Sequence, residues 1–239
     1  MLSRGKYVGV APWAYVVAVK VLDEAGRGSA GDALAGIQWI IDNHRRYNIR
    51  VANLSIGAAD VGRVDPLVRA VEAAWDAGIV VVVAAGNNGP SAQSITSPGT
   101  SRKVITVGAA DDGDLTEIGG SAVRNFSGRG PTLECIVKPD IVAMGCGVVS
   151  ALSNSPELTA ARRKGIAVVD RFYARMSGTS MASPKVAGAV AALLTKYPNL
   201  KPDEVKLRLK LSATDLRLSP NKQGWGELDI KKFLEIIAF

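Results

Sequence analysis

The sequence predicts an α/β fold in three layers, with a mostly parallel sheet and helices on both faces. Short apolar runs rich in valine and isoleucine alternate with longer stretches that carry apolar residues at helical spacing. Strands buried on both faces read as continuous apolar runs, and strand–helix–strand order favours parallel pairing. The 239 residues are 47% hydrophobic, enough for a sizeable core. We therefore expect a single domain over residues 1–239.

The first elements follow from local patterns. Residues 15–20 read Tyr-Val-Val-Ala-Val-Lys, are β-branched and apolar on both faces, and predict a short buried strand. Residues 29–43 open with a capping-box pair of Ser29 and Asp32 and continue with an apolar stripe, which predicts a helix. Residues 49–54 predict the second strand.

The remaining elements continue the alternation. Residues 65–78 open with Asp-Pro and close with glycine, as a capped helix does. Residues 79–84 form the most strongly apolar strand pattern, and 103–108 and 140–143 predict further strands. From residue 202, Pro-Asp-Glu predicts a helix start, although the apolar residues that follow alternate as in a strand.

Composition excludes several classes of protein. The net charge is +7, but the basic residues are scattered, which favours a solvated surface over a nucleic-acid groove. No apolar run approaches the length of a membrane span, and no apolar signal region follows the basic start. We therefore expect no membrane partner and a cytoplasmic location. Cys135 and Cys146 are too few for a disulfide framework, so we expect free thiols. No acidic cluster has metal-ligand spacing, so we expect no metal and no cofactor.

The stretch Gly178-Thr-Ser-Met-Ala-Ser-Pro184 carries the strongest chemical signal. It leads into an apolar run rich in alanine and glycine, which places Ser180 at a helix N-terminus. The unpaired N–H groups and the helix dipole there favour negative charge. This suits a serine that attacks a carbonyl and then lies beside an oxyanion. The structural alternative is a serine N-cap on a core helix.

Asn87 follows the most apolar strand pattern, in Ala84-Ala-Gly-Asn87. Ligands in open α/β sheets bind beyond the carboxyl ends of the strands, so Asn87 is expected on the side of a site. An amide that donates to a developing oxyanion contributes on the order of 3 kcal/mol. Taken alone, Gly86–Gly89 would favour a simple turn.

Together, the two motifs resemble those of the subtilisin-like serine proteases, the subtilases. Residues 53–57, Asn-Leu-Ser-Ile-Gly, resemble the family strand that pairs with the substrate backbone, and 126–131 and 138–143 resemble segments before its nucleophile loop. The resemblance covers nearly the whole chain from Gly9 onward. It implies a subtilisin-like fold and hydrolysis of peptide or protein substrates, with Ser180 and Asn87 as catalytic residues. It implies substrate-binding roles for Ser55, Ile56, Gly57, Ala84, Ala85 and Gly86.

The chain departs from the family pattern in several places. Lys185 stands where the family usually has histidine, and Ala143-Met-Gly145 stands where it has Ala-Pro-Gly. The family motifs that carry the triad aspartate and histidine do not occur, and the only histidine, His44, lacks its motif. The resemblance therefore implies a subtilase domain without its N-terminal part and first core strands, inactive alone. A non-catalytic peptide-binding or scaffolding pseudoprotease is the alternative. Exposed sheet edges would favour self-association.

Overall fold

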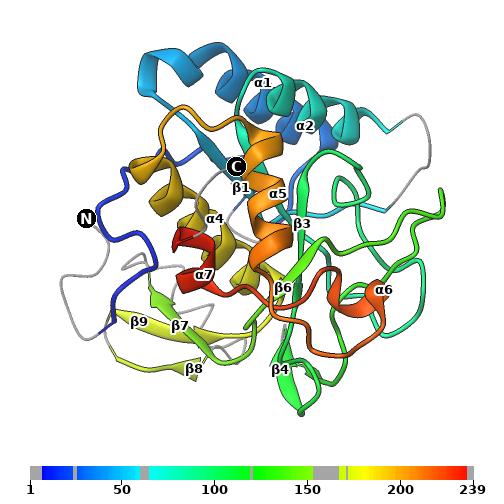
Figure 1. The fold of residues 1–239 in the computed structure, drawn as a ribbon. Coiled ribbons are helices and arrows are strands. Elements are labelled where there is room, and N and C mark those ends of the chain that lie inside the picture. Colours follow the sequence, from blue (N-terminus) through cyan, green and yellow to red (C-terminus); the bar gives the residue numbers. More distant parts are fainter. Residues whose placement is uncertain are drawn as a thin grey trace.

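The main sheet has four parallel strands in the order β1–β2–β3–β6 (Figure 1). The computed structural model describes residues 7–23, 26–59, 65–118, 121–152, 167–170 and 172–235. The strands are β1 Val51–Leu54, β2 Val80–Ala84, β3 Ile105–Ala109 and β6 Ile141–Ala143. The register joins Val51 to Val80 and Val82 to Ile105, so all four carboxyl ends lie at the same edge of the sheet.

Helices cover both faces of this sheet, which confirms the predicted three-layer α/β fold (Figure 1). Helices α1 (Ala30–Tyr47) and α2 (Pro66–Asp76) pack together on one side. Helix α4 (Thr179–Lys196) packs across β1, β2, β3 and β6 on the other side. Helix α7 (Ile230–Glu235) contacts both α4 and α5 (Pro202–Ser212), α5 also contacts β2, and the short α6 (Pro220–Gln223) precedes α7.

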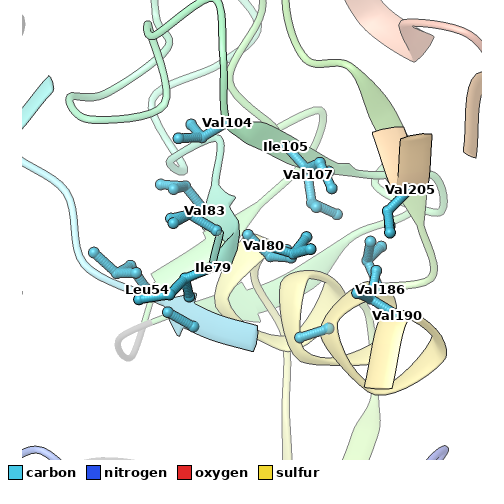
Figure 2. Packing of buried hydrophobic residues seen from close by; sticks show 14 of the residues in the cluster. Leu54, Ile79, Val80, Val83, Val104, Ile105, Val107, Val186, Val190 and Val205 are labelled. Atoms are coloured by element: carbon cyan, nitrogen blue, oxygen red, sulfur yellow. The ribbon is translucent and has the colours of Figure 1, made fainter. Parts of the chain in front are cut away.

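The core lies between β2 and β3 and the helix layers. Every residue of β2 and β3 is buried. Figure 2 shows Val80 and Val107 of the sheet facing Val186 and Val190 of α4, with Val205 of α5 beside them. Each fully buried valine of this kind contributes about 1.5–3 kcal/mol relative to an exposed one. This packing fixes the position of α4 against the strands.

Capping residues set the helix boundaries as expected. Ser29 and Asp32 form a complete capping box at the start of α1. The helix continues to Tyr47, about one turn past the expected end, because the basic residues of its last turn complement the helix dipole. Asp65 caps α2 through the amides of Leu67 and Val68.

The segment from residue 202 is a helix, as its opening predicts. Pro202 lies at the first helical position, and the Glu204 carboxylate accepts the backbone N–H of Lys201 at 2.7 Å. Val205 and Leu209, four residues apart, are buried, while Leu207 and Leu211 are 50% and 49% exposed. The alternating leucines therefore reflect apolar residues on the outer face of the helix rather than a strand.

The strand predicted at residues 15–20 is wrong. These residues form no strand, and Tyr15 and Val16 are 101% and 69% exposed. Within the described part of the chain, no backbone hydrogen bond joins residues 15–19 to β1. A strand exists only where a neighbour completes its hydrogen bonds. The apolar pattern is present here, but the partner strand is not within reach.

Two small antiparallel sheets were not predicted. One is the hairpin of β4 (Thr116–Ile118) and β5 (Ser121–Val123). The other has the order β7–β9–β8, with β7 Val148–Ala151, β8 Ala167–Val168 and β9 Tyr173–Met176. Strand β9 ends two residues before Gly178, so this sheet lies directly before the start of α4 in the chain.

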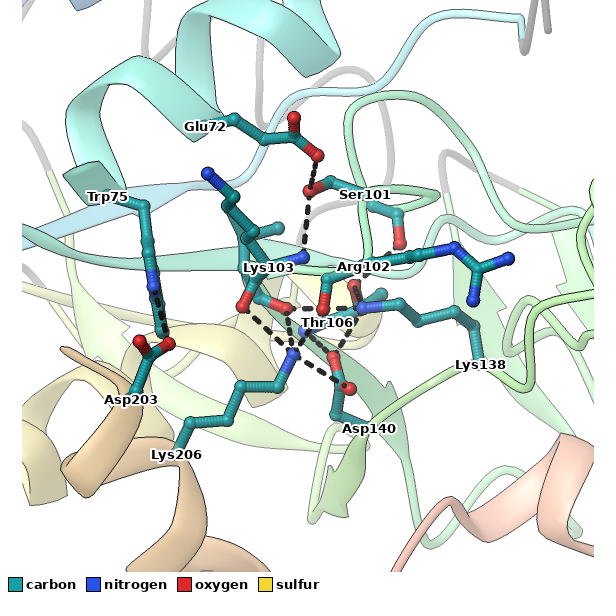
Figure 3. Close-up of polar contacts among 12 residues, drawn as sticks. Glu72, Trp75, Ser101, Arg102, Lys103, Thr106, Lys138, Asp140, Asp203 and Lys206 are labelled. Carbon is teal, nitrogen blue, oxygen red and sulfur yellow. Dashed lines mark hydrogen bonds and ion pairs between the residues drawn. The ribbon is translucent and has the colours of Figure 1, made fainter. Parts of the chain in front are cut away.

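A buried ionic network lies at one side of β3 (Figure 3). The carboxylate of Asp140 accepts from the ammonium of Lys138 at 2.6 Å and from the Thr106 N–H at 2.7 Å. The ammonium of Lys206 lies 3.2 Å from its second oxygen. Burial lowers the pKa of Lys138 to about 8 against the attraction of Asp140. The network thus ties β3, the chain before β6 and α5 together around one carboxylate.

We predict that Asp140→Asn lowers the free energy of unfolding by about 3–5 kcal/mol, because it leaves a buried cation without its carboxylate. The measurement is urea unfolding at pH 7. Asp76→Asn is the matched control, since the Asp76–Lys103 pair lies on the surface and its loss should leave unfolding nearly unchanged. Equal effects of the two substitutions would contradict the structural role of the buried network.

Candidate active site

Ser180 lies in the first turn of α4 and is half-buried. The helix begins at Thr179, and Gly178 is its N-cap with a φ of +145°. Among the described residues, the backbone N–H of Ser180 has no hydrogen-bond partner. It is one of the open donors that every helix presents at its N-terminus. The Ser180 hydroxyl therefore lies beside a donor and a positive dipole end, as an oxyanion site requires.

Asn87 lies directly against this turn. Its Oδ1 accepts hydrogen bonds from both the backbone N–H and the hydroxyl of Thr179, each at 3.0 Å. Since Oδ1 is held by two donors, the orientation of the amide is fixed and Nδ2 remains available to donate. Gly178 is required here, because its φ is positive and a Cβ would lie 3.3 Å from Asn87 Nδ2. The structure thus brings Asn87 to the residue that precedes Ser180.

Ser55 ties the end of β1 to the same turn. Its hydroxyl donates to the carbonyl of Ser180 at 3.2 Å and lies 3.1 Å from the Ser183 hydroxyl. Asn53 donates from Nδ2 to Ser55 Oγ at 3.1 Å. Because the single Ser55 hydrogen goes to Ser180, Ser183 must be the donor in the second contact. The carboxyl end of β1 and the start of α4 are therefore locked side by side.

The predicted substrate-binding residues differ in what they expose. Ala84 and Ala85 are 4% and 0% exposed, and the Ala85 N–H donates to Val107 O at 2.9 Å. The Gly86 N–H donates to Thr179 Oγ1 at 3.2 Å, so these three residues support the site from within. In contrast, the backbones of Ile56 and Gly57 have no hydrogen-bond partner among the described residues. This short stretch is open to pair with an extended peptide.

Thr96 joins the two predicted substrate-binding segments, and sequence reasoning missed it. A Cβ added at Gly57 or Gly86 would lie 2.6 Å from the Thr96 side chain, so a larger residue at either position would displace Thr96. The Thr96 N–H also donates to Ala85 O at 3.0 Å. The only sequence signal for this contact was the pair of glycines, 29 residues apart, because glycine permits a close approach by another side chain.

Asp111 holds the loop next to Gly178, and the sequence analysis did not identify it. Its carboxylate accepts the backbone N–H groups of Gly145 at 2.6 Å and of Cys146 at 3.1 and 3.0 Å. The Gly145 carbonyl in turn accepts the N–H of Gly178 at 2.9 Å. Burial, with the nearby charge of Asp111, raises the pKa of the Cys146 thiol to about 11. Cys146 is therefore a neutral thiol at pH 7 and not a nucleophile.

Neither basic residue singled out by the sequence lies in position to activate Ser180. His44 belongs to the last turn of α1, and its Nδ1 lies 2.6 Å from the carbonyl of Ile41. It precedes the start of β1, whereas Ser55 at the other end of β1 contacts Ser180. Lys185 lies five residues past Ser180, about 140° around the helix from it. Its side chain therefore leaves a different face of α4.

No group of three or more histidine, cysteine or acidic residues in the described ranges is placed to hold a metal ion. No helix there has the length and apolar character needed to cross a membrane. Cys135 and Cys146 are both free, as expected from their number.

Comparison with known families identifies a match over most of the chain. Residues 3–226 match the model of the Subtilase family, Peptidase_S8. The chain is 45% identical over 236 residues to the serine protease AprX of Bacillus subtilis (strain 168). The aligned region covers 95% of this chain and 53% of that protein. It is 36% identical over 211 residues to subtilisin DY of Bacillus licheniformis, covering 87% and 64%. The chain thus spans about half to two thirds of the length of these curated relatives.

Solved structures give the same result. The self-cleaved protease domain of PatA has a TM-score of 0.70 and 25% identity, with 97% of this chain and 77% of that one covered. The S41 psychrophilic protease has a TM-score of 0.68 and 30% identity, with 91% and 69% covered.

We predict that Thr179→Val frees the Asn87 amide, because it removes the hydroxyl donor that holds Oδ1 and leaves only the backbone N–H. The side-chain amide signals of Asn87 should broaden in NMR spectra, and the free energy of unfolding should fall by about 1 kcal/mol. Thr195→Val, at the other end of α4, removes a hydroxyl that bonds only to Ala191 O and is the matched control. Unchanged Asn87 signals in Thr179→Val would contradict this link.

Proposed function

This chain belongs to the subtilase family, and on that basis we propose that Ser180 is the nucleophile of a serine endopeptidase-type domain acting on peptide or protein substrates. The observation that carries the proposal is the contact between Asn87 and the first turn of α4. Asn87 Oδ1 is bound by Thr179, and Asn87 Nδ2 lies beside Gly178. A fixed amide donor next to a serine at a helix N-terminus is the arrangement that acyl transfer needs.

In the proposed reaction, Ser180 Oγ attacks the carbonyl carbon of the scissile peptide bond and loses its proton to a general base. The carbonyl oxygen gains the negative charge, which the Ser180 N–H and Asn87 Nδ2 stabilise. The C–N bond then breaks as the base returns the proton to the leaving amine, and an acyl-enzyme remains for water to hydrolyse. Ile56 and Gly57 would pair with the substrate backbone beside the serine.

The general base is the part that these residues do not supply. A serine hydroxyl without a base is a weak nucleophile at neutral pH. His44, the only histidine of the 239 residues, lies beyond the opposite end of β1. We therefore propose that these 239 residues alone are inactive or nearly so. Hydrolysis then needs an aspartate–histidine pair from polypeptide outside these residues.

A non-catalytic peptide-binding module is the second candidate. It is favoured by the same absence of a base and by the open backbone of Ile56 and Gly57 among the described residues. It differs from the first candidate in one respect that can be measured. A binding module keeps its affinity for peptides and gains no hydrolysis when a base is supplied.

We predict that the purified chain hydrolyses a fluorogenic peptide at a rate no more than about 10³–10⁴-fold above water, the residual effect of an oxyanion hole and binding. Mixing it with a separate polypeptide that carries the family's aspartate strand and histidine helix should raise kcat/KM by orders of magnitude. Ser180→Ala should abolish this gain, and Thr195→Val, at the other end of the same helix, is the matched control.

The outcomes separate the two candidates. A gain that depends on Ser180 supports the endopeptidase, while peptide binding without any gain supports the binding module. Rapid hydrolysis by the chain alone that survives His44→Ala and Lys185→Ala but is lost in Ser180→Ala would overturn the proposal that the base is external.

A further inference from the structure

A short turn after β6 holds the chain directly before the candidate active site. It comprises residues 145–147, and we call it the 145–147 turn. The carbonyl of Gly145 accepts the backbone N–H of Gly178 at 2.9 Å, and the N–H of Gly147 donates to the Ser177 hydroxyl at 3.0 Å. Two consecutive residues immediately before α4 are therefore bound to the backbone of this turn.

Gly145 is also in steric contact with the start of α4. A Cβ added at Gly145 would lie 2.9 Å from the carbonyl oxygen of Gly178 and 3.5 Å from the Cβ of Ala182 in α4. On the other side, it would lie 3.0 Å from the Cβ of Ala109 in β3. The backbone of Gly145 thus fills the space between β3 and α4, and a shift of the turn must move Gly178.

Asp111 determines where the 145–147 turn lies. It is the second residue after β3, and β3 and β6 are neighbours in the main sheet (Figure 1). Its carboxylate accepts the N–H of Gly145 at 2.6 Å and that of Cys146 at 3.1 and 3.0 Å. Hydrogen bonds to an ionised acceptor are about twice as strong as neutral ones. One side chain therefore fixes two successive peptide groups of the turn.

Gly178 lies between the two hydrogen-bond donors of the proposed oxyanion site. It is the N-cap of α4, two residues before Ser180, whose backbone N–H is the first donor. A Cβ at Gly178 would lie 3.3 Å from Nδ2 of Asn87, which is the second donor. The carbonyl of Gly178 also accepts the N–H of Met181 at 3.0 Å. A displacement of Gly178 therefore changes the separation of the two donors and the direction in which they point.

The contacts of Asp111 differ from those of the neighbouring carboxylate. Asp112 accepts the N–H of Ser127 at 3.1 Å and lies 3.5 Å from the ammonium of Lys222. In contrast, both backbone N–H groups that Asp111 accepts belong to the 145–147 turn. Asp112 is thus part of an ionic contact with α6, whereas Asp111 acts on the turn that holds Gly178.

We propose that Asp111 is a positioning residue of the candidate active site, which acts through Gly145 on Gly178 and thereby on the two oxyanion donors. The inference rests on the proposed function, because it assigns a role within the same site. It adds a residue that acts through the backbone of the turn and not by contact with a substrate. The geometry of the two donors can be measured without a general base, so the test does not require catalysis.

The probe is N-acetyl-tetra-alanine with a free C-terminal carboxylate, compared with the same peptide as a C-terminal amide. The carboxylate carries a charged oxygen that the oxyanion donors can bind, whereas the amide is neutral. Titration of the Ile56 and Gly57 amide signals in NMR spectra gives both affinities. The unsubstituted chain should bind the acid about tenfold more tightly, because hydrogen bonds to a charged acceptor are stronger. This ratio is measured on folded molecules and does not report stability.

Asp111→Ala removes both acceptors of the turn and should reduce the acid-to-amide ratio to about twofold or less, because the donors no longer converge on one oxygen. The amide proton of Gly178 should exchange with solvent about tenfold faster. Asp65→Ala is the matched control, because Asp65 also accepts two successive backbone N–H groups, those of Leu67 and Val68. It caps α2 on the face of the sheet opposite α4 and should leave the ratio unchanged.

Gly145→Ala tests the same path while the carboxylate is kept. The added methyl group would overlap the carbonyl oxygen of Gly178, so the turn and Gly178 must separate. This variant should also lose the preference for the acid, and it keeps the proposal open to test if Asp111→Ala does not fold. Circular dichroism establishes that each variant is folded.

Activity gives a second measurement. In the mixture that supplies the aspartate–histidine pair, Asp111→Ala should lower kcat about 10²-fold, the effect of a misplacement of about 1 Å. KM should stay within about twofold, because the backbone of Ile56 and Gly57 still pairs with the substrate. A mixture without activity would overturn the proposed function, while the acid-to-amide ratio would still decide the role of Asp111.

Three results would contradict this role. An unchanged acid-to-amide ratio in folded Asp111→Ala or Gly145→Ala would mean that the 145–147 turn does not set the donors. An equal loss in Asp65→Ala would mean that the ratio follows any local loosening of the fold. No preference for the acid in the unsubstituted chain would mean that the donors are not arranged for an anion.

Discussion

The contact between the first turn of α4 and the carboxyl ends of β1 and β2 is the constraint on which the rest of the molecule depends. Two adjacent parallel strands end at the same level because their register is fixed by buried valines such as Val80 and Val83. Asn87 beyond one strand and Ser55 at the end of the other then bond to consecutive residues of α4. Neither link would form if either strand slipped by one residue.

Small residues in α4 and a buried ionic network at α5 both hold helices against the sheet. Ala182 and Ser183 are fully buried where α4 crosses the strands, so the helix approaches closely enough for its first turn to reach Asn87. At the far side of β3, Asp140 collects two lysine ammonium groups and holds α5 against the sheet. Close packing of α4 on the strands therefore positions the site, while the ionic network fixes the position of α5.

Local patterns predicted the four strands of the main sheet and the helices α1, α2, α4 and α5, and failed where a distant partner was the deciding factor. The apolar run of β2 and the capped start of α5 indicate their structures without outside information. Residues 15–20 have an equally good strand pattern but no neighbour to pair with. Thr96 and Asp111 were not predicted because their roles arise from contacts with residues distant in the chain. The juxtaposition of Ser180 with Asn87 was foreseeable because each follows a recognisable junction.

Ser55 joins the end of β1 to the candidate active site. Its hydroxyl bonds to the Ser180 carbonyl and to Ser183, and Asn53 of β1 donates to it in turn. A displacement of β1 would therefore reach the first turn of α4 through one side chain, whereas a displacement of β2 would reach it through Asn87 and Thr179. The position of Ser180 thus depends on both strands at once.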